Sequence, residues 1–126
     1  MITIRGSRDS RGNARIIKSD GSDKSLLDER LDWANHSPGG MEWGYYGSGP
    51  TQLAIAMLGA VADRTVALNH YYEFKTEVVA RFPRSGWQMS VEEIRRWLNQ
   101  KIELGEGLPD ASPQLRIIPI KNVTPQ

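Results

Sequence analysis

The sequence contains no cysteine, which excludes disulfide bonds, a thiol nucleophile and thiolate metal ligands. Histidine is almost as scarce, with only His36 and His70 in the whole chain. The acidic run DGSDKSLLDE lacks the alternating oxygen ligands and the terminal glutamate of a calcium loop. We therefore expect no metal site and no cofactor.

Long apolar runs and a strong net charge are missing too. No run reaches the length of a membrane span, and the N-terminal MITIRGSRDSR has too few consecutive apolar residues for a signal peptide core. The net charge of +1 gives no global argument for nucleic acid or an anionic membrane as the partner. These absences indicate a cytoplasmic protein that does not act on a membrane.

The chain is long enough for one domain with a real core, since it has 126 residues of which 39% are hydrophobic. We expect residues 1–102 to form this single domain. Residues 103–126 are expected to be a linker and C-terminal extension, with ELGEGLPDASP as the linker and a candidate strand at residues 115–119.

The N-terminal third predicts a β-hairpin. Two β-prone runs, at residues 2–6 and 13–18, flank the turn-forming SRDSRG. Asp20-Gly21 predicts a turn that closes the second strand. The stretch from 24 to 36 is ambiguous between a short helix and an extended segment laid across the core.

Three helices are expected in the remainder. Ser48 should cap a helix from Pro50 to about Ala62 that is apolar on nearly every side, and hence buried on most faces. Amphipathic patterns predict helices at about 65–81 and 91–102, the latter opened by a capping box at Ser90. Trp87 and Met89 are candidates for a short strand between these helices. The sequence thus predicts an α+β fold, with an antiparallel hairpin packed on a buried central helix and two amphipathic helices.

The stretch N-H-S-P-G-G-M-E-W-G-Y-Y-G-S-G-P-T-Q-L-A, at residues 35–54, is followed by Phe74-Lys75, Glu77-Val78-Val79 and Gly86-Trp87. It resembles an uncharacterised domain-of-unknown-function family of phage, plasmid and bacterial genomes, whose core reads N-H-S-P-x-G-F-x-W-G-Y-G-G-S-G-P-A-Q-L-A. The resemblance covers about residues 2–98. It departs from the family at Met41, usually phenylalanine, and at Tyr46, usually glycine. It implies a mobile-element setting and brings no activity with it.

The glycine-rich junction before the central helix has two interpretations. In one, backbone N–H groups at the helix start bind a phosphate or carboxylate, with Tyr46 crowding the approach. The ligand-binding residues would then be His36, Tyr46, Gly47, Ser48 and Gly49. In the other, which we favour, the glycines only allow a tight turn and Trp43 and Tyr45 anchor the core. The spacing matches neither a Walker loop nor a dinucleotide fingerprint.

A catalytic interpretation is also available. Asp32, His36 and Ser37 are the residue types of a nucleophilic triad. The same residues fit a plain turn before Pro38, and no G-x-S-x-G elbow is present. We therefore assign no catalytic residue.

The predicted hairpin carries the one charge asymmetry of the chain, with five cations against Asp9 alone, a local excess of +4. They are Arg5, Arg8, Arg11, Arg15 and Lys18. Such a hairpin fits either a solvated edge strand or a contact with nucleic acid, although no aromatic residue interleaves to stack on bases. Trp33, in the ambiguous stretch, is a core residue by default and an interface anchor if exposed.

The leading hypothesis is a non-enzymatic binding protein of a mobile element that docks on another protein, such as an inhibitor of a host defence system of the anti-CRISPR kind. Its partner-binding residues would be Arg5, Arg8, Arg11, Arg15 and Trp33. The alternatives are a small-ligand or nucleotide-phosphate binder at the helix start, and a small enzyme centred on His36.

Overall fold

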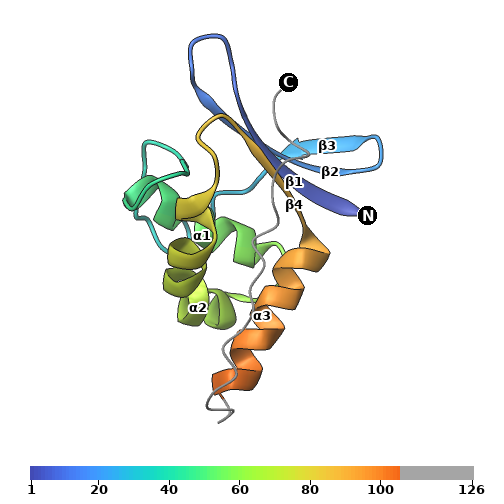
Figure 1. Ribbon diagram of the computed structural model, residues 1–126, viewed down its shortest axis with the longest axis vertical. Helices are drawn as coiled ribbons and strands as arrows, with labels where there is room; N and C mark the ends of the chain where they lie inside the picture. Colours follow the sequence, from blue (N-terminus) through green and yellow to red (C-terminus); the bar gives the residue numbers. More distant parts are fainter. Residues whose placement is uncertain (106–126) are drawn as a thin grey trace.

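The computed structural model describes residues 1–105, which form a four-stranded antiparallel sheet with helices packed against one side (Figure 1). The strands are β1 (Ile2–Arg8), β2 (Ala14–Asp20), β3 (Asp23–Leu26) and β4 (Trp87–Ser90), in the order β3-β2-β1-β4. The helices are α1 (Ser48–Gly59), α2 (Arg64–Glu77), the 3₁₀ turn η1 (Val79–Arg81) and α3 (Val91–Gly105). The predicted α+β class and N-terminal hairpin are confirmed.

The two faces of the sheet differ sharply in burial. Cross-strand partners share a face, and the pairs Ile4 with Met89 and Gly6 with Ile16 are all buried. These residues form the inner face, which meets the helices in the core. Side chains alternate between the two faces along each strand, so the residues next to these lie on the opposite, outer face. Arg5 and Arg15 are exposed there.

Strand β3 resolves the ambiguity of residues 24–36. Gly21, with φ 66°, makes the predicted turn, and the chain then returns beside β2, so that the extended alternative holds at the start of the stretch. All four residues of β3 are exposed, which is why no apolar alternation marked it as a strand. No helix forms between Leu27 and Gly47.

Helix α1 is the buried central helix that the sequence predicted, with every residue from Gly49 to Leu58 buried. The predicted cap was wrong. The helix begins at Ser48, so this serine lies inside the first turn and its side chain does not cap the helix. Gly47 occupies the cap position, with an extended backbone. The helix also ends at Gly59, before the predicted Ala62.

The remaining elements follow the predictions closely. Asp63 caps α2, which ends at Glu77 before η1 continues to Arg81. The capping box is confirmed, because Ser90 Oγ accepts from Glu93 N at 3.1 Å and Glu93 Oε1 accepts from Ser90 N at 2.8 Å. Helix α3 continues to Gly105, into the stretch assigned to the linker. The candidate strand at 115–119 lies outside the described residues.

Three tryptophans occupy the core, as predicted. Trp87 stacks on Phe82 at 4.3 Å between ring centroids and meets Trp43 edge-on at 5.8 Å, while Trp97 meets Phe74 edge-on at 4.9 Å. All three tryptophans are at least 98% buried. The prediction of Tyr45 as a core anchor was wrong, since 40% of it is exposed.

Candidate functional site

The long motif at residues 35–54 folds around one buried side chain. Gln52 is fully buried on α1, and its amide Nε2 donates to the carbonyls of Glu29 at 2.7 Å and Ala34 at 3.0 Å. Its Oε1 accepts from the backbone N–H groups of His36 at 2.8 Å and Ser37 at 3.2 Å. Gln52 thus satisfies four backbone groups of the preceding loop and fixes that loop on the central helix.

The motif's tryptophan and its neighbouring glycine also have structural roles. Trp43 Nε1 donates to the carbonyls of Pro83 at 2.9 Å and Arg84 at 3.1 Å, which ties the motif to the loop before β4. Gly44 has φ 89°, and a Cβ there would lie 2.2 Å from Cδ of Arg84. These contacts give Gln52, Trp43 and Gly44 structural roles within the motif.

The residues of the catalytic hypothesis are engaged separately. Ser37 Oγ donates to the Gly40 carbonyl at 2.6 Å, and the exposed His36 packs its ring 5.6 Å from that of Tyr71. Asp32 is exposed. No hydrogen bond within the described residues joins any two of these three side chains, so the arrangement is that of a turn rather than of a triad.

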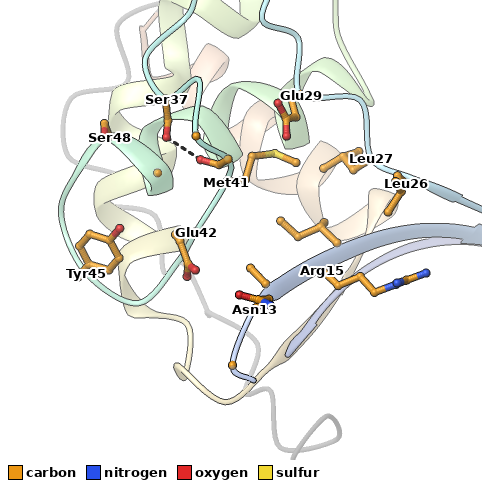
Figure 2. A pocket seen from close by; sticks show the side chains of 16 residues that line it. Asn13, Arg15, Leu26, Leu27, Glu29, Ser37, Met41, Glu42, Tyr45 and Ser48 are labelled. Carbon is orange, nitrogen blue, oxygen red and sulfur yellow. Dashed lines mark hydrogen bonds between the residues drawn. The ribbon is translucent and has the colours of Figure 1, made fainter. Parts of the chain in front are cut away.

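A pocket opens between the first half of β2 and the loop that leads into α1 (Figure 2). Its volume is about 760 Å³. Its apolar lining consists of Ala14, Ile16, Leu26, Leu27 and Met41. Its polar side chains are those of Asn13, Arg15, Glu29, Ser37, Glu42, Tyr45 and Ser48. This volume lies within the range of pockets that receive a ligand, although the lining is more polar than is usual for such sites.

The charged residues that line this pocket, two glutamates and Arg15, do not favour the anion interpretation. Glu29 and Glu42 both line it, and hydrogen bonds from the Arg8 guanidinium hold the pKa of Glu42 below its ordinary value, so Glu42 is ionised at neutral pH. Of the five predicted ligand-binding residues, only Ser48 and Gly49 line the pocket. Tyr46 is 66% exposed elsewhere, and neither His36 nor Gly47 contributes to the lining.

The structure separates the predicted partner-binding residues. Arg5 and Arg15 lie on the outer face, and Arg11 is exposed in the hairpin turn. Arg8 instead lies on the inner side, where its guanidinium pairs with Glu42 and covers the Trp43 ring at 4.3 Å. It is therefore committed within the protein and is not presented to a partner.

Trp33 does not behave as an exposed anchor. It is partly buried against the core, with the guanidinium of Arg30 4.4 Å above its ring. Gly59 leaves room for it, because a Cβ there would lie 2.9 Å from Cζ3 of Trp33. This tryptophan mainly fastens the irregular loop to the end of α1.

The outer face carries a feature that sequence reasoning missed. Cross-strand pairing places Leu26 beside Ile17, Ile17 beside Arg5, and Arg5 beside Gln88, in one row across all four strands. Leu26 is 68% exposed. Arg15 and Lys24 lie on the neighbouring rows. Only the pairing of β3 brings Leu26 and Lys24 to the predicted arginines, and the exposed β3 gave no periodic signal.

We define the outer face by the residues that this register places on it, which include three cations and no acidic side chain. They are Thr3, Arg5, Ser7, Arg15, Ile17, Ser19, Lys24, Leu26, Gln88 and Ser90. The local field there is accordingly positive, although the whole chain is nearly neutral.

Residues 1–105 contain neither a candidate metal site nor a candidate membrane-spanning helix. No group of three or more histidine or acidic side chains is placed to hold a metal ion in that range. None of the helices there has both the length and the apolar composition needed to cross a bilayer.

Comparison with known proteins identifies the family of the chain but assigns it no function. No curated protein and no solved structure matches it. One family model matches, described as a family of unknown function (DUF6166), and the match covers residues 4–100. That range takes in most of β1, the other three strands, the motif around Gln52 and most of α3. The chain therefore belongs to this family of unknown function, DUF6166.

Proposed function

We propose that the protein is a small non-enzymatic binding protein that docks through its outer face on an acidic surface of another protein. The observation that carries this proposal is the solvent-facing row of Leu26, Ile17 and Arg5, with Arg15 and Lys24 on the neighbouring rows. Two aliphatic side chains flanked by cations are compatible with a protein interface, in which arginine is a frequent hot spot.

The same face favours a protein over a nucleic acid. No aromatic side chain is among the ten outer-face residues, so this surface offers no platform for stacking bases. Leu26 presents an aliphatic surface that a phosphate backbone would leave unburied. We therefore take nucleic acid as the competing outcome of the test.

The concrete setting that we propose is inhibition of a host defence system, such as CRISPR interference, in the host cytoplasm. Its support is the small size of the domain and the phage and plasmid setting implied by the sequence resemblance. An inhibitor of this kind acts by covering a functional surface of its target, and needs no catalytic residues of its own.

The test compares three full-length chains as affinity baits in host lysate. The first is the unaltered protein, and the second carries Arg5→Ala, Arg15→Ala and Lys24→Ala. The third is a matched control with the same loss of charge in the helical layer, through Arg64→Ala, Arg81→Ala and Arg95→Ala. All six positions are exposed, so both variants should keep their circular dichroism spectra and melting temperatures.

We expect one stoichiometric protein partner that the outer-face variant loses and the control retains, with binding that weakens as salt rises. Equal retention by both variants would contradict docking through this face. Capture that disappears on nuclease treatment would assign the face to nucleic acid. For the defence setting, the unaltered chain should restore plating of a targeted phage on a CRISPR-active host, and the outer-face variant should not.

A further inference from the structure

Strand β2 has an edge that its neighbours leave partly open. It spans seven residues, and β1 pairs with all of them, from Ala14 to Asp20. On the other side β3 pairs only with the portion from Ile17 to Asp20, and one more bond, from Leu27 N to Ile16 O at 3.0 Å, ends the contact. No strand within residues 1–105 lies on that side of Ala14 and Arg15.

The direction of the backbone groups follows from the pairing. In an antiparallel ladder, successive residues direct their N–H and C=O groups to opposite neighbours. The carbonyl of Ile16 points to the β3 side, since it accepts from Leu27 there. Ala14 lies two residues earlier, so its N–H and its C=O both point to the β3 side as well. The N–H of Ile16 points to that side too. A short row of strand-pairing groups faces outward.

These groups border the pocket. Gly12 to Ile16 form one wall, and the loop with Met41 and Glu42 forms the wall opposite (Figure 2). Ala14 and Ile16 also direct their side chains to the inner face, where Leu27 and Met41 complete an apolar floor. A strand laid beside Ala14 would thus pair its backbone with β2 and turn alternate side chains into the pocket.

The charges of the pocket indicate which strand would fit. Glu42 is already neutralised by Arg8, but the carboxylate of Glu29 forms no hydrogen bond or ion pair with any other described residue. Arg15 also lines the pocket, but the pairing register directs its side chain to the outer face of the sheet. A strand with apolar residues at alternate positions and a basic residue near Glu29 would therefore match this edge.

We propose that the β2 edge at Ala14–Ile16 binds an extended peptide segment of a partner protein by β-strand addition, with alternate apolar side chains in the pocket and a lysine or arginine near Glu29. This site borders the outer face, with which it shares Arg15 and Leu26, but its backbone pairing at Ala14–Ile16 does not depend on the function proposed for that face. Backbone pairing supplies affinity, and the pocket and Glu29 supply selectivity.

The experiment selects ligands on the immobilised full chain from a displayed library of random peptides. Enriched peptides are synthesised and each is N-methylated at one residue at a time. Methylation at every second residue should abolish binding, and methylation at the intervening residues should leave it intact, because only one edge of the peptide pairs with β2. In nuclear magnetic resonance titrations, the amides of Ala14 and Ile16 should shift most.

The protein side is tested by Ala14→Pro, which removes the outward N–H at the first residue of a strand, where proline is tolerated. Affinity should fall about tenfold, while Ala14→Ser, which keeps the N–H, should bind as the unaltered chain does. Glu29→Gln should weaken selectively the peptides that carry a basic residue.

Three results would overturn the proposal. The first is that the library enriches no peptide. The second is that binding does not depend on which residues of the peptide are N-methylated. The third is that the amides of Ala14 and Ile16 are already protected from hydrogen exchange in the peptide-free chain. The last would assign the edge to a segment of the chain itself or to a second copy.

Discussion

Arg8 and Glu42 form a forked ion pair that ties the N-terminal hairpin to the motif loop, with Nη2 to Oε1 at 2.7 Å and Nη1 to Oε2 at 3.1 Å. The same guanidinium donates through Nε to the Arg84 carbonyl at 2.7 Å and packs on the Trp43 ring. One arginine therefore joins three segments that are distant in sequence. This role separates it from Arg5 and Arg15, although all three belong to the same basic hairpin.

Replacement of Arg8 with alanine should destabilise the fold by about 2–3 kcal/mol, because it leaves the partly buried Glu42 carboxylate without its cation. It also removes one of the two side-chain hydrogen bonds to the Arg84 carbonyl. Arg8→Lys should recover only part of this, since an ammonium cannot form the fork. Urea unfolding measures both. Arg5→Ala, on the outer face, should change the free energy of unfolding by less than about 0.5 kcal/mol. Equal effects at Arg8 and Arg5 would contradict the assignment.

The ion pair should also make stability depend on pH. The hydrogen bond from Arg8 lowers the pKa of Glu42 from its ordinary value of 4.5 in the folded chain. The stabilisation is therefore fully present above that ordinary value and is lost as pH falls through the lower folded-state pKa. Glu42→Gln should flatten the acid side of a plot of unfolding free energy against pH.

Asp9 titrates in the same direction and must be controlled for. Backbone hydrogen bonds from Asn13 and Arg11 lower its pKa. The comparison is best made with Asp9→Asn in both chains. Acid limbs of equal slope with and without Glu42→Gln would show that the pair contributes nothing to the pH dependence.

Gln52→Met keeps the approximate volume of the side chain and removes its hydrogen bonds, leaving four backbone groups of the loop without their partner. The free energy of unfolding should fall by about 3 kcal/mol or more. His36→Ala is the control within the same motif. Its ring is exposed and only its backbone is held by Gln52, so its effect should stay within about 0.5 kcal/mol. A larger loss at His36 than at Gln52 would reverse our interpretation of the motif.

Gly6→Ala should be destabilising by about 2–3 kcal/mol through overpacking. A Cβ at Gly6 would lie 2.3 Å from Nε1 and 2.5 Å from Cε2 of the fully buried Trp87. Gly39→Ala provides the matched control, because a Cβ there meets no atom within 4 Å. Thermal unfolding of the two variants distinguishes them, and similar melting temperatures would refute the close packing of Trp87 on β1.

The local elements could be predicted because their signals are local. The hairpin runs, the apolar α1, the break at Asp63 and the capping box at Ser90 are each encoded within a few neighbouring residues. The errors arose where a local signal had more than one use. Ser48 is a residue type that often caps helices. Here the extended Gly47 occupies the cap position, so Ser48 is already the first residue of the helix and does not cap it.

The candidate sites were less predictable because they depend on pairing between distant segments. The basic character of the hairpin was visible, but not that Arg8 would be turned inward by the strand period while Arg5 and Arg15 face out. Nor was β3 visible, since its exposed residues carry no alternation. The pocket needs β2, Leu27 and Met41 together, and nothing in their separate stretches indicates that they meet.

By itself, the sequence determined the α+β class, the buried central helix and the tryptophan core, because hydrophobic periodicity and capping act over a few residues. Only the tertiary structure decided which arginines meet solvent, which one holds Glu42, and where β2 keeps an open edge. Those outcomes depend on strand register, and a shift of one residue would have exchanged the two faces of the sheet.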